Sequence, residues 1–320
     1  MQDIMGGFFG LELPVYNNFP YEESPCCAFV NSGRAAFECL LQNMPRPARV
    51  WVPRFICNTV LEALEHLGIS VCRYSCDAQL APELPEIGGL DMVLLVNYFG
   101  LTEPQILAAA ARYPGQCIID ATTALYSPPP AGVPVFYSPR KFCGVADGGV
   151  AHAPLALTAR PEAASQSATA SLYLLERLES GAAAAMEACE QAERRLSGPP
   201  RRMSRLTRCL LRSIDFQAAA QARLRNYAIL HEGLKSINRL ELPDQPLHAP
   251  MCYPFVCGIP GMRDALIDAG IALPLYWPEV IEATDAHCTE NQLARQLLPL
   301  PLDQRYSEKQ IKNLLDLILN

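Results

Sequence analysis

Two residues of opposite charge, Asp120 and Lys141, each follow an apolar segment in the first half of the chain. Asp120 ends the segment CIID, and Lys141 comes shortly after the segment VPVFYS. If both segments are strands of one sheet, the carboxylate and the ammonium come to the same edge, where an ion pair is the common arrangement. The other interpretation is a pyridoxal phosphate (PLP) site, in which the lysine forms a Schiff base and the aspartate keeps the pyridine nitrogen protonated. The pair alone leaves both interpretations open.

A second group of residues has the chemistry of a phosphate site. Ser32, Gly33 and Arg34 open a helix directly after the short apolar segment AFVN. The first turn of a helix offers free N–H groups and the positive end of its dipole, and glycine allows close approach of the backbone. Ser138 lies three residues before Lys141 and could add a hydroxyl. The simpler interpretation is that Ser32 is an ordinary helix cap.

The surrounding pattern predicts the elements that would position these residues. Apolar segments alternate with helical ones over the first 150 residues, as in a mostly parallel sheet flanked by helices. In such sheets ligands bind at the carboxyl ends of the strands, where all of these polar residues fall. We expect helices at 32–44, 58–67 and 103–112, and strands at 49–53, 69–74, 91–97 and 116–120.

The rest of the chain predicts a different organisation. Residues 161–235 are rich in Ala, Leu, Glu and Arg and indicate long helices, interrupted at SGPP (197–200). The remainder has shorter strand-like pieces such as CYPFVCGI and closes on an amphipathic helix at 307–319. We therefore predict a large domain at 1–235 and a small C-terminal domain at 236–320.

Composition excludes several classes of protein. The chain has 320 residues, 50% of them hydrophobic, and a net charge of −7, which argues against general binding to nucleic acid or to an anionic membrane. We expect neither a signal peptide nor a membrane span, and therefore a cytoplasmic protein. The 13 cysteines include the spaced pairs Cys72/Cys76 and Cys252/Cys257, but no histidine stands near either pair, so no metal site is predicted.

Several blocks occur together in an order that resembles a known family. They are NSGRAAF, VWVPRFICNTVLEALEHLGISV, VLLVNYFG, CIIDATTALYS and FYSPRKFCGVADGGV, followed by ARLRNYAIL, GIALPLYWP and LLPLPLDQRYSEKQIKNLL. Their order and spacing resemble the DegT/DnrJ/StrS family of PLP-dependent aminotransferases over nearly the whole chain. The resemblance implies an α/β protein of PLP-transferase fold type I. That fold has a three-layer α/β/α large domain with a mostly parallel sheet, and a small α+β C-terminal domain.

The resemblance also implies roles for particular residues. Lys141 would carry the Schiff base and transfer the substrate proton, and Asp120 would bind the pyridine nitrogen. Gly33 and Arg34 would give backbone N–H groups to the phosphate, and Ser138 its hydroxyl. The resemblance further places Thr123 near the ring, and Phe55 is the nearest aromatic residue that could stack on it, although strict alignment puts Cys57 there.

The chain departs from the family pattern in three places. Its serine stands three residues before Lys141 instead of five, and the sequence after the lysine is GVADGG instead of one ending in GEGG. The family's asparagine that reaches the phosphate of the partner subunit has no counterpart beside Arg201 and Arg202. Whether Arg34, Arg201 or Arg202 contacts phosphate or substrate stays open.

The resemblance implies transfer of an amino group from an amino acid, with glutamate as the expected donor, to a keto acceptor such as a nucleotide-linked keto sugar. It also implies small-molecule substrates and a homodimer with sites at the interface. Two alternatives remain: another reaction on the same cofactor, such as a dehydration or a lyase step, and a non-catalytic protein of this fold that acts as a sensor or partner. The sequence does not name the acceptor.

Overall fold

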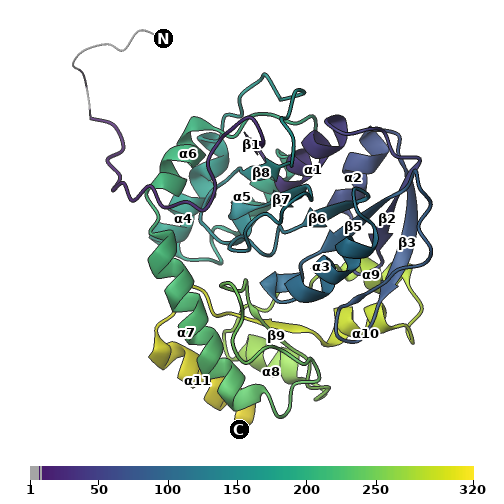
Figure 1. Cartoon of the computed structure of the whole chain (residues 1–320). Coiled ribbons are helices and arrows are strands. Elements are labelled where there is room, and N and C mark those ends of the chain that lie inside the picture. Colours follow the sequence, from purple (N-terminus) through teal and green to yellow (C-terminus); the bar gives the residue numbers. More distant parts are fainter. Residues whose placement is uncertain (1–6, 8) are drawn as a thin grey trace.

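The computed structural model describes residue 7 and residues 9–320. Within them, eight strands form one sheet in the order β1-β8-β7-β6-β5-β2-β3-β4 (Figure 1). The strands β3, β2, β5, β6 and β7 are parallel neighbours in this sheet, and β8 runs antiparallel between β7 and β1. The strands are β1 (Cys27–Val30), β2 (Arg49–Pro53), β3 (Ser70–Cys76), β4 (Pro82–Glu83), β5 (Met92–Val96), β6 (Cys117–Asp120), β7 (Val135–Tyr137) and β8 (Gly149–His152).

Three helices connect the strands of the first half, as the sequence predicts. They are α1 (Gly33–Gln42), α2 (Thr59–His66) and α3 (Glu103–Arg112). Helix α1 packs against β7, β8 and α2, whereas α3 contacts β4 and β5, so that helices flank the sheet (Figure 1). The expected α/β architecture with a mostly parallel central sheet is therefore confirmed.

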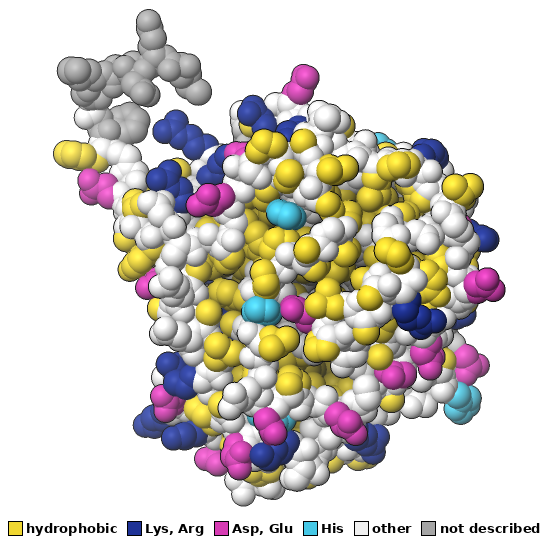
Figure 2. Space-filling model, viewed as in Figure 1, with side chains coloured by type: hydrophobic (Ala, Val, Ile, Leu, Met, Phe, Trp, Pro, Cys, Tyr) yellow, Lys and Arg dark blue, Asp and Glu magenta, His cyan; other side chains and the backbone are white. Residues whose placement is uncertain are grey.

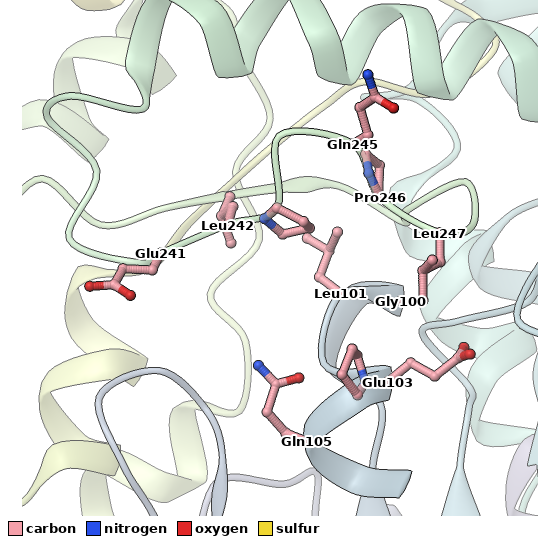
Figure 3. A pocket seen from close by; sticks show the side chains of 11 residues that line it. Gly100, Leu101, Glu103, Gln105, Glu241, Leu242, Gln245, Pro246 and Leu247 are labelled. Carbon is pink, nitrogen blue, oxygen red and sulfur yellow. The ribbon is translucent and has the colours of Figure 1, made fainter. Parts of the chain in front are cut away.

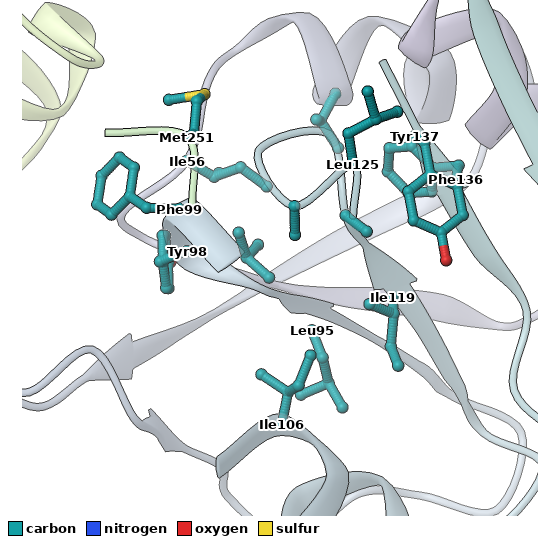
Figure 4. Packing of buried hydrophobic residues seen from close by; sticks show 14 of the residues in the cluster. Ile56, Leu95, Tyr98, Phe99, Ile106, Ile119, Leu125, Phe136, Tyr137 and Met251 are labelled. Carbon is teal, nitrogen blue, oxygen red and sulfur yellow. The ribbon is translucent and has the colours of Figure 1, made fainter. Parts of the chain in front are cut away.

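The central strands of the sheet are apolar and buried. Every residue of β5 and of β6 is buried, and this matches the continuous apolar sequences of strands covered on both faces. Figure 4 shows Leu95 and Ile119 of these strands among side chains from α3 and from the segments above the sheet edge, including Ile106, Phe99 and Met251. This packing fixes the strand ends from which the polar residues of the site project.

The middle of the chain is helical, but of its predicted long helices only one, α7, is long, and residues 161–168 and 182–185 lie outside the helices. The helices are α4 (Leu172–Ser180), α5 (Met186–Arg194), α6 (Arg205–Arg212) and α7 (Phe216–Leu234), and the predicted interruption at 197–200 separates α5 from α6. Short 3-10 turns stand at η1 (Tyr98–Gly100), η2 (Pro139–Lys141) and η3 (Thr169–Ser171). The turn η2 carries Lys141 directly out of β7 to the edge of the sheet.

The C-terminal part combines a two-stranded antiparallel sheet with helices. It contains β9 (Tyr253–Phe255), β10 (Leu298–Leu300), α8 (Met262–Asp268), α9 (Pro278–Ala283), α10 (Thr289–Gln296) and α11 (Glu308–Leu319). Ser307 and Gln310 form a capping box that begins α11, and α11 packs along α7. Because α7 also contacts β9, this helix joins the two parts, and the predicted boundary after residue 235 stays a prediction.

The described residues include no helix that is both long and apolar enough to cross a membrane. The cysteines in this part of the chain are free thiols, and no group of three or more His, Cys, Asp or Glu side chains there could hold a metal ion.

Candidate active site

Three segments bring the predicted residues to one edge of the sheet. Asp120 ends β6, Ser138 and Lys141 follow β7, and Gly33 begins α1 just after β1. A pocket of about 430 Å³ opens at this edge. All of the predicted site residues except Phe55 line it: Gly33, Arg34, Asp120, Thr123, Ser138 and Lys141.

The first turn of α1 forms one wall of the pocket. Ser32 has extended backbone geometry, and its hydroxyl accepts the N–H of Ala35 at 3.0 Å, so the serine does cap the helix. The N–H groups of Gly33 and Arg34 come before the first hydrogen bond within the helix, so the helix itself gives them no partner. A Cβ at Gly33 would lie 3.0 Å from Thr122 Cγ2 and 3.4 Å from Ser138 Cβ, so only glycine leaves this space open. The wall therefore has the shape and the donors of an anion cradle.

Asp120 lies buried at the base of the pocket with 4% of its surface exposed. Its Oδ1 atom accepts the backbone N–H of Thr122 at 2.8 Å. Burial raises the pKa of this carboxyl, and the nearby Lys141 ammonium and the bond from Thr122 oppose that rise. The carboxylate is therefore held at the sheet edge at some electrostatic cost, which a bound cationic group would relieve.

Lys141 reaches into the same pocket, and its Nζ atom donates to Thr122 Oγ1 at 3.0 Å. The protein atoms around it limit its hydration and lower the pKa of the ammonium, and Asp120 opposes this change. The side chain nevertheless remains accessible through the pocket. The ammonium bonds to the neutral Thr122 hydroxyl, and its charge also acts on Asp120.

The two threonines after Asp120 differ in their contacts. Thr123 lines the pocket, but its hydroxyl donates to the Asn97 carbonyl at 2.9 Å and accepts the Phe99 N–H at 3.1 Å. Thr122 instead contacts the predicted site residues, through its N–H to Asp120 and its hydroxyl to Lys141. Sequence reasoning missed Thr122, although its position two residues after the aspartate was a usable signal.

Phe55 does not line the pocket, and this corrects the expectation that it stacks on a bound ring. Its side chain is fully buried and packs edge-on against Trp277, with ring centroids 4.6 Å apart. Tyr98 donates its hydroxyl to the Phe55 carbonyl at 2.6 Å and belongs to the same packing. Cys57, the residue at the aligned place, does line the pocket. The chain turns after Phe55, so the aromatic ring faces the core.

A segment from the C-terminal part forms the opposite wall, and sequence reasoning missed it. Residues 274–279 line the pocket, and Glu279 Oε1 accepts the N–H of Asn58 at 2.8 Å, which fastens the segment to the start of α2. Trp277 lies at φ 57° and ψ 62°, in the left-handed region that a bulky residue rarely adopts. Such strain persists where surrounding packing enforces it and clusters at ligand sites.

Two arginines line the pocket as well. Arg34 pairs with Glu62 of α2 and donates to the Leu196 carbonyl at 3.0 Å, and Arg140 pairs with Glu193 of α5. Arg201 and Arg202 are exposed and lie outside the lining of this pocket. The backbone of Arg201 instead bonds to the Asn31 side chain at 2.9 Å. Within one chain, therefore, neither Arg201 nor Arg202 reaches the predicted phosphate cradle.

A second pocket, of about 290 Å³, lies between the start of α3 and the loop at 241–247 (Figure 3). Glu103, Gln105 and Glu241 line it together with prolines and leucines. It contains no lysine, arginine or histidine and therefore offers no amine nucleophile. The chemistry predicted from the sequence belongs to the first pocket.

No family model matches the chain, and no curated protein matches it. Solved structures do. A sugar aminotransferase from Micromonospora echinospora is 16% identical and aligns over 92% of this chain and 87% of its own, with a TM-score of 0.63. A DegT DnrJ EryC1 StrS aminotransferase from Brucella abortus is 18% identical over 92% and 85%, with a TM-score of 0.61. A candidate sugar aminotransferase from Streptococcus pneumoniae, in its PLP form, is 13% identical over 95% and 87%, with a TM-score of 0.63.

At such low identities these likenesses establish the fold. The chain has the architecture of PLP-transferase fold type I, as the sequence motifs implied, over nearly its whole length. The structures that it resembles include a member of the family that the motifs indicated.

Proposed function

We propose that the protein is a PLP-dependent aminotransferase that moves an amino group from an amino acid, with glutamate as donor, to a keto group on a nucleotide-linked sugar. One observation carries the proposal: Lys141, Asp120, Ser138 and the first turn of α1 line a single pocket at the carboxyl edge of the sheet. The fold is also that of sugar aminotransferases, one of them solved in its PLP form. Fold alone would not assign the reaction, so the residues of the pocket decide.

The donor set of the pocket fits PLP. The N–H groups of Gly33 and Arg34, together with the Ser138 hydroxyl, would hold the phosphate. The Asp120 carboxylate would face the pyridine nitrogen, since its Oδ1 is fixed by Thr122 and its burial favours a cationic neighbour. When bound, the cofactor supplies an electron sink that makes the substrate α-proton removable.

Lys141 has the properties that amine chemistry requires. Its lowered pKa increases the fraction of neutral amine, which is the form that attacks a carbonyl or accepts a proton. The Thr122 hydroxyl orients Nζ within the pocket while adding no charge. Lys141 would then take the proton from the substrate α-carbon and return it in the reverse direction. Pro274, Leu275 and Trp277 present apolar surface to the same pocket.

We also propose that the working form is a homodimer. Helix α4 has no buried residue among those described, and it exposes Leu172, Leu175 and Leu178. Figure 2 shows apolar side chains gathered across the centre of one face, with charged side chains mostly around its edge. Such apolar surface is typical of an interface between subunits. Light scattering coupled to gel filtration should therefore give about twice the 35.1 kDa chain mass.

The first experiment loads the purified protein with PLP and records its visible absorption before and after excess L-glutamate. Borohydride reduction and peptide mapping then locate the trapped cofactor. We expect it on Lys141, with none on Lys235, an exposed lysine that pairs with Glu232 and serves as the internal control. A spectrum that bleaches with glutamate supports the amino donor as well as the cofactor.

Other outcomes would separate the alternatives. Cofactor trapped on Lys141 that responds to no amino acid would favour another reaction or a non-catalytic protein. No trapped cofactor, with the protein folded, would overturn the proposal. The acceptor is then sought by reacting the amino form of the loaded protein with nucleotide-linked keto sugars and with simple keto acids.

A further inference from the structure

Two arginine side chains that are largely covered by protein line the pocket beside Lys141. The side chains of Arg34 and Arg140 are each 15% exposed, whereas their carboxylate partners Glu62 and Glu193 are 51% and 56% exposed. The arginines are thus fixed in the wall, whereas both glutamates are exposed, and of the two only Glu193 lines the pocket. Ion pairs to an exposed carboxylate contribute little, because water competes for the carboxylate. These glutamates can therefore be replaced by another anion at small cost.

Arg140 also has unused hydrogen-bonding capacity. Its Nε atom is buried and has no partner among the described residues. A buried donor without a partner is uncommon and indicates a missing acceptor. A guanidinium group binds a carboxylate best through two parallel N–H groups. The Arg140 fork is therefore only partly satisfied by Glu193.

The charge of Arg140 acts on Arg34. Burial lowers the pKa of Arg34, the positive charge of Arg140 lowers it further, and Glu193 opposes this. The charge of Arg140 also lowers the pKa of Lys141, and that of Glu193 raises it. Glu193 therefore lies where one negative charge compensates several positive ones. An anion of the substrate would gain most at the same place.

We propose that Arg34 and Arg140 form a subsite for a carboxylate of the substrate, which Glu193 occupies in the free protein. The assignment rests on the proposed function for the identity of the substrate. Replacing the Glu193 carboxylate by that of a ligand conserves the charge of the site. Leu196 and Leu275, which also line the pocket, would contact a short aliphatic chain. The planar guanidinium forks favour a carboxylate over a compact anion.

A purely structural explanation makes a different prediction. If the Arg140–Glu193 pair only holds α5 against the pocket, loss of either partner should act in the same direction. If Glu193 competes with a ligand for Arg140, Arg140→Gln should weaken binding and Glu193→Gln should strengthen it. The opposite signs separate the two explanations.

The test measures binding of glutarate by isothermal titration calorimetry to the purified protein, with and without PLP. Glutaramide, its uncharged analogue, is the ligand control. Arg140→Gln and Arg34→Gln should each weaken glutarate binding about tenfold or more, because a charge-assisted bond is lost. Glu193→Gln should strengthen it several-fold. Arg194→Gln is the matched control, since Arg194 is 78% exposed and pairs with Glu190 within α5.

The proposal is overturned if glutarate binds neither the wild-type protein nor Glu193→Gln, or if Glu193→Gln weakens binding as Arg140→Gln does. A second titration uses uridine diphosphate and distinguishes a carboxylate from a phosphate ligand. If Arg140→Gln weakens binding of uridine diphosphate but not of glutarate, the carboxylate assignment is also overturned. These titrations need no turnover. The subsite can therefore fail while cofactor is still trapped on Lys141, or hold in a protein that traps none.

Discussion

Two buried aspartates in this molecule have contrasting surroundings. Asp147 is 1% exposed and accepts bonds from the Ser204 N–H at 2.9 Å, the Ser204 hydroxyl at 2.8 Å and the Thr207 hydroxyl. Asp120 is 4% exposed and accepts the Thr122 N–H, with Lys141 near but bonded elsewhere. The first carboxylate is saturated by the protein, and the second is not.

The difference distinguishes a structural residue from the one to which the proposed function gives a binding role. Asp147 joins the loop after Lys141 to the first turn of α6, where the helix dipole also favours a negative charge. Its bonds are complete, so it has nothing to offer a ligand. Asp120 keeps acceptor capacity toward the pocket, and its raised pKa records the cost of that arrangement. Substitutions at the two sites should therefore have opposite consequences for activity and stability.

The largest expected effect is the loss of activity in Asp120→Asn. The amide can still accept the Thr122 N–H but cannot hold a cationic ring nitrogen, so turnover should fall about 1000-fold or more, which corresponds to roughly 4 kcal/mol. Steady-state kinetics on the loaded protein would measure it. Activity within about threefold of wild type would show that Asp120 does not serve the cofactor.

The same variant should be more stable than wild type when no cofactor is bound. Because the pKa of Asp120 is raised on folding, the folded state binds more protons than the unfolded state above pH 3.8 and up to the raised value. Stability therefore falls as the pH rises through this window, and it stays lower at neutral pH. Asp120→Asn removes the loss, so we expect a gain of about 1 kcal/mol at pH 7 that disappears in acid. Urea unfolding at several pH values would test the sign.

For Asp147→Asn we expect the reverse. The amide group places a donor against the hydroxyl and N–H donors of Ser204 and Thr207, so the free energy of unfolding should drop by about 3 kcal/mol. Any variant protein that remains folded at low temperature should still trap PLP on Lys141. Unchanged stability in urea unfolding would contradict the view that this network is structural.

Much of the fold could be predicted because its signals are local. The apolar segments MVLLV and CIID predicted the strands β5 and β6, since strands covered on both faces are continuously apolar. Helix α3 lies at the predicted residues, and Ser32 begins α1 as a serine cap should. The sequence therefore predicts that the residues following these strands lie at one edge of the sheet.

The parts that could not be predicted depend on contacts distant in sequence. Trp277 reaches the pocket from the C-terminal part, and the turn after β2 directs Phe55 into the core against it. Neither fact is encoded by a nearby pattern. The partners Glu62 and Glu193 likewise come from helices whose approach to α1 and η2 is set by packing. Sequence patterns thus predicted the polar residues that lie at the edge of the sheet. The residues that line the rest of the pocket come from distant parts of the chain.

A further prediction tests the phosphate cradle with Gly33→Ala. The new Cβ would lie 3.0 Å from Thr122 Cγ2, so that side chain must shift, and PLP affinity should fall about tenfold. Stability should change little, because alanine is also the better helix former. Fluorescence titration with PLP would measure the affinity. Gly89→Ala is the matched control, since a Cβ there meets nothing within 4 Å. An equal loss in both variants would argue against the cradle.

The smallest effect is expected for Thr122→Val, which removes the hydroxyl that accepts the Lys141 bond but keeps the N–H to Asp120. That bond stabilises the ammonium, so its loss should lower the pKa of Lys141 further. Because the neutral amine captures PLP, the capture rate should begin to rise at a pH lower by up to about one unit. Thr122→Ser keeps the hydroxyl and should show no shift. Stopped-flow capture across a pH series measures this, and a shift toward higher pH would mean that Thr122 favours the neutral amine instead.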